Sequence, residues 1–179
     1  MGLLQSTWEP AMERHSRNRQ WGTLTPSEGL DYQFTTMIRM DPASGRFSVA
    51  GVEETLEPRM RYHRFESHPA FPLMPEVPSR RASNYREHRF PEGTFEGYPV
   101  TGTASFTNGE LESLWLAILT GRRDGALNRY LREEPRLLEL QDRWLRDVVG
   151  VESREYPWGL VWSRFNINAG WHDIAIFFS

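Results

Sequence analysis

Apolar and polar residues alternate along two segments that lie far apart in this chain, at 30–40 and at 171–178. A period of two is typical of a half-buried strand, because successive side chains of a strand point to opposite faces. The segment at 30–40 is followed by turn residues at 41–45 and by another apolar run at 46–52. The segment at 171–178 is preceded by an apolar run at 160–167 and by a turn that contains Gly170. The alternation therefore predicts two β-hairpins, at 30–52 and at 160–178.

Between these hairpins the spacing of apolar residues predicts helices. The run Thr107-Asn108-Gly109-Glu110 has the form of a capping box, in which side chains satisfy the first N–H groups of a helix. The apolar residues after it share one helical face: Leu111, Leu114, Trp115 and Ile118. A second helix is expected after Asp124, and Pro135 either kinks it or opens a third that ends at Gly150.

This order of elements predicts an α+β fold. An antiparallel sheet is built from the N-terminal and C-terminal hairpins and covered on one face by a central two- or three-helix block. The length of 179 residues and the 39% hydrophobic content suit a single domain spanning 1–179. A Pro/Arg-rich loop is expected at 58–97, followed by a strand at 98–106. Prolines recur in that loop at the three-residue period of polyproline II: Pro69, Pro72, Pro75 and Pro78.

All 21 basic residues are arginine, and the chain has neither lysine nor cysteine. This composition, which a high-GC genome explains most simply, excludes Schiff-base and thiolate catalysis, disulfides and cysteine-ligated metals. The sequence also lacks a nucleophile elbow, a Gly-rich phosphate loop and a dinucleotide fingerprint, so we expect no cofactor. It has no apolar run of membrane-spanning length and no signal-peptide pattern, which predicts a cytoplasmic protein without a transmembrane segment.

Positive charge is concentrated in residues 58–90. Seven arginines and three glutamates give this stretch a net charge of +4, so the rest of the chain carries −7 of the total of −3. We predict an electropositive surface that binds an acidic protein partner or a small anionic ligand, and the net charge of the chain disfavours nucleic acid. Four arginines are its candidate residues: Arg59, Arg61, Arg80 and Arg81. The alternative is a solvated loop whose arginines pair with the acidic residues at 133–142.

Tryptophans gather near the C-terminal hairpin and could line a pocket or an interface, because tryptophan combines a large apolar area with one polar group. If residues 160–167 form a strand, Trp162 and Arg164 lie on one face and give it a mixed aromatic and polar character. The candidate ligand-binding residues are Trp158, Trp162, Arg164 and Trp171.

Histidines and a glutamate in the Arg-rich stretch are the candidate catalytic residues: His63, Glu66, His68 and His88. A histidine oriented by a carboxylate can act as a general acid or base near neutral pH. Their spacing fits no metal motif such as H-E-x-x-H, so no metal site is predicted.

Three short patterns resemble eukaryotic signalling sites, each of a kind that occurs often by chance. The N-terminus fits N-myristoylation at Gly2. Residues 75–80 fit the P-x-x-P-x-R form of a polyproline ligand, and residues 80–83 resemble a basophilic kinase target.

Two function classes remain. The first is a non-enzymatic binding or interaction protein, immunity- or adaptor-like, which uses the Arg/aromatic/Pro-rich segment and the Trp-rich C-terminal hairpin. The alternative is a small cofactor-independent enzyme of cyclase, isomerase or hydrolase type. It would use a His-carboxylate pair in a Trp-lined pocket, with arginine holding an anionic substrate. The absence of any catalytic motif favours the first class.

Overall fold

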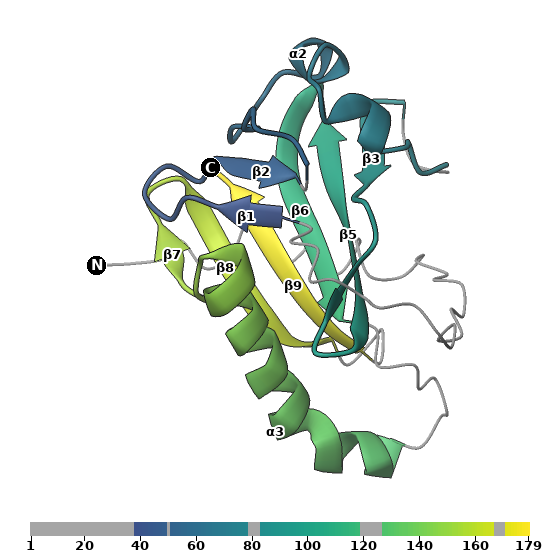
Figure 1. The fold of residues 1–179 in the computed structure, drawn as a ribbon, viewed down its shortest axis with the longest axis vertical. Helices are drawn as coiled ribbons and strands as arrows, with labels where there is room; N and C mark the ends of the chain where they lie inside the picture. The colour runs from purple at the N-terminus through teal and green to yellow at the C-terminus, as the bar shows by residue number, and fades with distance from the viewer. Residues whose placement is uncertain (1–37, 50, 79–82, 119–126, 167–170) are drawn as a thin grey trace.

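The computed structural model describes residues 38–49, 51–78, 83–118, 127–166 and 171–179, with the side chains of these residues except those of 127–134, 164–166 and 171–173. Figure 1 shows one large twisted sheet with a short two-stranded sheet and a long helix in front of it. The elements are β1 (Ile38–Met40), β2 (Phe47–Val49), α2 (Tyr62–Glu66), the 3₁₀ helix η1 (Phe71–Leu73), β3 (Tyr85–Arg89), β4 (Gly93–Phe95), β5 (Tyr98–Thr107), β6 (Glu110–Ile118), α3 (Leu127–Trp144), the π-helical turn η2 (Leu145–Val149), β7 (Glu155–Tyr156), β8 (Gly159–Asn166) and β9 (Trp171–Phe178).

Two long hairpins form the centre of the large sheet. Its strands run in the order β3–β5–β6–β9–β8–β7, and β4 also pairs with β5. Every pairing in it is antiparallel. The predicted C-terminal hairpin is confirmed as β8 and β9, with Val161 opposite Ile176. The strand predicted at 98–106 is confirmed as β5.

The helix predicted after residue 107 is wrong, because residues 110–118 form strand β6. Asn108 and Gly109 have positive φ angles of 53° and 78°, which suit the two central residues of a type I′ hairpin turn. The chain therefore reverses direction here and does not enter a helix. Neighbouring residues such as Leu114 and Trp115 are both buried in β6. A strand buried on both faces loses its period of two, so its apolar positions can also fit a helical spacing.

The predicted N-terminal hairpin is confirmed within residues 38–49, where Met40 lies opposite Phe47. It forms a two-stranded sheet of its own, so the prediction that both terminal hairpins build one sheet is wrong. Both sides of the β8–β9 hairpin already have partners in β7 and β6. Side chains hold β1–β2 on the large sheet: the Phe47 and Phe178 rings stack with centroids 6.1 Å apart, and the Trp158 Nε1–H donates to the Pro42 carbonyl at 3.0 Å.

Helix α3 stands where a block of two or three helices was predicted, and that prediction is wrong. Pro135 lies inside α3, so it neither ends one helix nor opens another. It is exposed, and water can hydrate the carbonyl that its missing N–H leaves unbonded. The helix continues into η2 and ends at Gly150, whose φ is 93°. In Figure 1, α3 lies along β8 and β9, where Trp144 joins the main core.

The Pro/Arg-rich stretch contains four short elements: α2, η1, β3 and β4. Pro72 lies within η1, so the expected polyproline II conformation does not hold there. The Pro75 carbonyl accepts the Arg89 N–H at 2.9 Å, and the Val77 N–H donates to the Glu87 carbonyl at 2.7 Å. These bonds place the segment along the outer edge of β3, which would otherwise be an edge strand.

Candidate interaction face

Four arginines lie over two glutamates beside α2. Arg59 and Arg61 both pair with Glu110 at the start of β6, and the Arg61 Nη2–Glu110 Oε1 distance is 2.9 Å. Arg46 and Arg64 likewise share the carboxylate of Glu57. We call the six residues the cationic face: Arg46, Arg59, Arg61, Arg64, Glu57 and Glu110. Each carboxylate balances one of its two guanidinium groups, so the six residues carry a net charge of +2.

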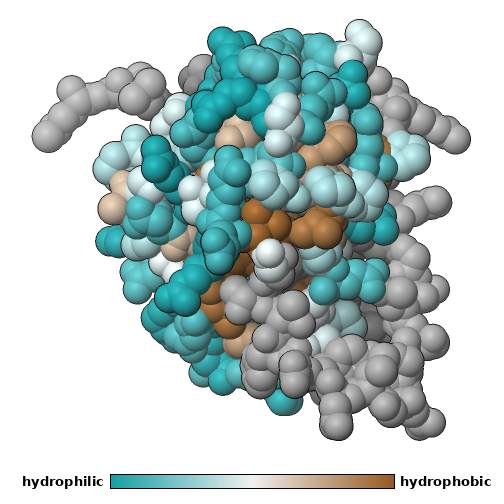
Figure 2. All heavy atoms as spheres, turned by 45° about the horizontal axis from the view of Figure 1, so that its top comes forward, coloured by the Kyte–Doolittle hydropathy of each residue, from teal (hydrophilic) through white to brown (hydrophobic). Residues whose placement is uncertain are grey.

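The glutamates of the cationic face lie deeper than the arginines. The side chains of Arg59 and Arg61 are 47% and 61% exposed, whereas that of Glu110 is 20% exposed. In the second group both arginines are 59% exposed and the glutamate 32%. Hydrophilic residues gather over the end of the molecule that carries α2 (Figure 2). An approaching molecule therefore meets guanidinium groups first, and pairing with one carboxylate leaves each arginine with N–H donors for a further acceptor.

A strained turn supports Arg59. The Met60 N–H donates to the Glu57 carbonyl at 3.1 Å, and Arg59 between them has a φ of 60°. With Pro58 in the second place, this is a type II turn, whose third position favours glycine. A left-handed conformation costs a non-glycine residue about 1–2 kcal/mol. Residues kept in such conformations concentrate at functional sites, so this position is a candidate for function as well as for the ion pair with Glu110.

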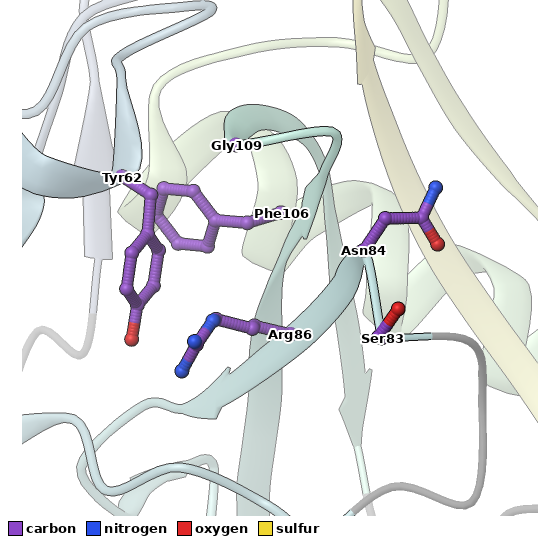
Figure 3. Close-up of a pocket in the computed structure, with 6 residues that line it drawn as sticks. All are labelled: Tyr62, Ser83, Asn84, Arg86, Phe106 and Gly109. Carbon is purple, nitrogen blue, oxygen red and sulfur yellow. The ribbon is translucent and has the colours of Figure 1, made fainter.

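A pocket of about 100 Å³ adjoins the cationic face, and we call it the Arg86 pocket. Its lining, drawn in Figure 3, consists of Tyr62, Ser83, Asn84, Arg86, Phe106 and Gly109. The guanidinium carbon of Arg86 lies 4.7 Å from the centroid of the Tyr62 ring, in a cation–π arrangement. The Asn84 Nδ2 group donates to Asn108 Oδ1 at 2.7 Å, which ties the start of β3 to the β5–β6 turn. The pocket is thus built by α2, by β3 with the residues just before it, and by the β5–β6 hairpin.

Buried His88 supports the Tyr62 wall of this pocket. Its Nδ1 lies 2.7 Å from the Met74 carbonyl oxygen, and its Nε2 lies 3.1 Å from the Tyr62 hydroxyl. A carbonyl only accepts, so Nδ1–H donates to Met74 and Nε2 accepts the Tyr62 proton. Burial raises the pKa of Tyr62, and Arg86 offsets part of this effect, so the hydroxyl keeps the proton that it donates. Both ring nitrogens of His88 are thereby engaged within the fold.

The other candidate catalytic residues lie on α2 or just after it, and none of them lines the Arg86 pocket. His63 and Glu66 are exposed on α2. His68 is buried, its Nδ1 accepts the Ala70 N–H at 3.1 Å, and its Nε2 lies 3.8 Å from a carboxylate oxygen of Glu54. Within the described residues, no three histidine, aspartate or glutamate side chains are grouped closely enough to hold a metal ion. The four predicted residues therefore do not meet at one point.

The C-terminal tryptophans also separate. Trp158 is buried in the main core, and its ring stacks on Tyr156 with centroids 4.8 Å apart. Trp162 is half-buried and packs in a second apolar cluster with Trp115 and Phe177. Trp158 contacts the β1–β2 hairpin through its hydrogen bond to Pro42, and it does not share an apolar cluster with Trp162.

Several predicted site residues lie wholly or partly outside the described part of the chain. Arg164 and Trp171 belong to β8 and β9, where the register pairs them with Asp173 and Asn166, and their side chains are not described. Arg80, Arg81 and Gly2 lie entirely outside the described residues.

Sequence reasoning missed the roles of Glu110, Tyr62 and Arg86. Glu110 was assigned to a helix cap, although the Asn-Gly pair before it is the commonest signal of a two-residue hairpin and would have placed Glu110 on a strand. Tyr62 and His88 are 26 residues apart, and no local pattern indicates that they meet.

Comparison with known proteins gives one distant structural likeness. No protein-family model matches the chain, and no curated protein matches it. A chain of the solved structure described as "Rhs1-CT in complex with cognate immunity protein RhsI1" is 13% identical, with a TM-score of 0.48. The likeness covers 79% of this chain and 87% of that chain. At this identity and TM-score it supports no conclusion about the present protein.

Among the described residues, no helix has the length and apolar character needed to cross a membrane.

Proposed function

We propose that this chain is a non-enzymatic binding protein, immunity- or adaptor-like, which docks an acidic surface of a protein partner on the cationic face. The observation that carries the proposal is the arrangement of Arg59 and Arg61, whose exposed guanidinium groups share one deeper carboxylate of Glu110. Side chains oriented before binding lose less conformational entropy when they bind. Arginine is also enriched at protein interfaces and pairs with carboxylates through two parallel hydrogen bonds.

The charge favours an acidic protein over nucleic acid. The cationic face carries +2, whereas the whole chain carries −3. Binding to nucleic acid draws its affinity from many phosphate contacts, which a patch of this size does not supply. A small cationic patch on an acidic chain is enough to raise the rate of encounter with an acidic surface and to orient it.

The enzyme alternative gains no support from the described residues. His88 is the candidate histidine next to a pocket, and its two ring nitrogens already bond to Met74 and Tyr62. A general base must reach the proton that it removes, and this ring presents no nitrogen to the pocket.

Photo-crosslinking tests the proposal, because a chain without cysteine allows a single thiol to be labelled. A His63→Cys variant carries a benzophenone on exposed α2, and a Glu152→Cys variant carries the same group at an exposed position before β7. In an extract of the source cells we expect a covalent adduct with a partner from the His63→Cys variant alone. The yield should fall between 0.15 M and 1 M salt, since the Debye length shortens from about 8 Å to about 3 Å.

The adduct should also disappear when Arg59→Gln and Arg61→Gln are added to the His63→Cys variant. Equal yields from the two labelled positions would contradict the proposal, and so would an adduct that survives both high salt and the loss of the two arginines. Such results would show that α2 meets other proteins without any contribution from the cationic face.

A further inference from the structure

We infer that the Arg86 pocket receives one carboxylate side chain of the acidic partner, and that Glu76 occupies Arg86 as an internal competitor until the partner binds. This inference rests on the proposed function, because it assigns a chemical role to the pocket beside the cationic face. It adds an anchoring site and a residue that weakens binding.

The pocket offers one cation within a mixed wall. Arg86 lies against the face of the Tyr62 ring, also interacts with the Tyr62 hydroxyl and is half-exposed, and the five N–H donors of its planar guanidinium leave some for a further acceptor. Ser83 and Asn84 add neutral hydrogen-bonding groups at the rim. The Tyr62 hydroxyl bonds to His88, so the tyrosine presents its ring to the pocket and can pack against the methylene groups of an acidic side chain.

A carboxylate suits this lining better than a phosphate does. A single guanidinium fork matches the two oxygens of one carboxylate. A phosphate monoester carries a charge of about −1.5 to −2 and is typically held by a cluster of arginines. Within the described residues, Arg86 is the one cationic side chain that lines the pocket.

Glu76 already places a carboxylate on Arg86, but the contact is long. The Arg86 Nη1–Glu76 Oε2 distance is 3.5 Å and both side chains are half-exposed, whereas a charge-assisted hydrogen bond measures about 2.7–2.9 Å. The backbone on either side of Glu76 is fixed: Pro75 and Val77 bond to β3, and Glu76 itself bridges to His88. The carboxylate therefore stays near Arg86 without a tight bond, and a partner carboxylate can displace it.

Substitutions with effects of opposite sign test this arrangement. The probe is a fluorescent hexaglutamate peptide, with hexaglutamine as its uncharged counterpart, and the affinity is measured by anisotropy. Arg86→Gln should weaken hexaglutamate binding by about tenfold. Arg86→Lys should also weaken it, because lysine keeps the charge but loses the fork and the stacking on Tyr62. Glu76→Gln should strengthen binding by about two- to fivefold, the range of an exposed ion pair.

Glu66→Gln is the matched control for charge. Glu66 is exposed at the end of α2 and does not line the pocket, but its charge, like that of Glu76, helps to raise the pKa of Tyr62, so its substitution removes an equal nearby charge that lies outside the pocket lining. We expect Glu66→Gln to change the affinity by less than about half of the Glu76→Gln effect, since Glu66 acts on the pocket only at a distance through screening salt, whereas Glu76 pairs directly with Arg86. Melting curves establish that each variant is folded, and Arg86→Lys tests the pocket if Arg86→Gln does not fold.

The outcomes separate the pocket from the proposed function. Equal gains from Glu76→Gln and Glu66→Gln, or wild-type affinity in Arg86→Lys, would overturn the role of the pocket. If Arg59→Gln with Arg61→Gln then still abolished binding, the proposed function would stand. Failure of the wild-type chain to distinguish hexaglutamate from hexaglutamine would contradict both.

Discussion

Replacing Gly45 with alanine measures how firmly the β1–β2 hairpin is held on the large sheet. Gly45 has a φ of 70°, and a left-handed conformation costs other residues about 1–2 kcal/mol. A Cβ added there would lie 2.5 Å from Cδ2 of Trp158. The indole cannot easily move away, because it donates a hydrogen bond to Pro42 and stacks on Tyr156. Overpacking of this kind costs about 1–3 kcal/mol, so we expect Gly45→Ala to reduce the free energy of unfolding by about 2–5 kcal/mol.

Gly51→Ala is the matched control. Gly51 also has a left-handed φ, of 80°, but a Cβ there would meet no atom of the described residues within 4 Å. Its cost should therefore be the conformational part alone, about 1–2 kcal/mol. The difference between the two variants, about 1–3 kcal/mol, measures the overlap with Trp158. In a chain of this size each kcal/mol corresponds to about 2–4 °C in Tm, so thermal and urea unfolding both resolve it.

A double-mutant cycle then assigns the cost to the indole. In a Trp158→Ala background, Gly45→Ala should cost no more than Gly51→Ala does, because the atoms that the Cβ would meet are gone. Equal costs for the two glycines in the wild-type background would refute the reasoning. An undiminished Gly45→Ala cost without the indole would also refute it, since the hairpin would then be held by other contacts.

Three further substitutions test individual side chains, two at the site and one on α3. Arg59→Gly should be more stable than Arg59→Ala by about 1–2 kcal/mol in urea unfolding, because both lose the ion pair but only glycine relieves the left-handed turn; equal stability would exclude strain at this position. Burial raises the pKa of Tyr62, so the contribution of its hydroxyl to stability is present below the unfolded pKa of about 10 and is lost as the pH rises through the higher folded pKa. Tyr62→Phe should remove this part of the alkaline loss, and unfolding curves of the two proteins between about pH 9 and 11 compare it. Arg143→Gln breaks a two-bond pairing with Glu96, at 3.0 and 3.1 Å, and should cost at most about 1 kcal/mol because both side chains are substantially exposed.

Alternating apolar and polar residues predicted the described N-terminal hairpin and β9, although β9 is buried on both faces from Ile174 to Phe178, whereas the apolar spacing of β6 predicted a helix. The described part of the N-terminal hairpin keeps a period of two, with Ile38 and Met40 buried and Arg39 exposed between them. β6 lacks that period because its Trp115 face and its Leu114 face are both buried. Its apolar run therefore matched a helix, and the error removed one of the two central strands of the sheet from the prediction.

At the site, the residues of the Arg-rich segment could be predicted from the sequence, but their contacts with distant segments could not. The sequence indicated an Arg-rich, aromatic segment, and Arg59 and Arg61 do lie at an exposed face. The alternative interpretation paired these arginines with the acidic residues at 133–142, whereas both pair with Glu110, which lies next to a hairpin turn. The Tyr62–His88 bond depends on how α2 packs against β3, and neither segment carries a pattern that reports this packing.

Two double variants of equal charge test the cationic face most directly, with hexaglutamate as the probe. Arg59→Gln with Arg61→Gln removes two positive charges from the face, and Arg146→Gln with Arg154→Gln removes two from exposed positions on η2 and just before β7. At low salt we expect the first pair to weaken binding at least about tenfold, or about 1.4 kcal/mol, and the second to change it by less than about twofold. Equal losses in the two double variants would contradict the account, because binding would then follow net charge alone.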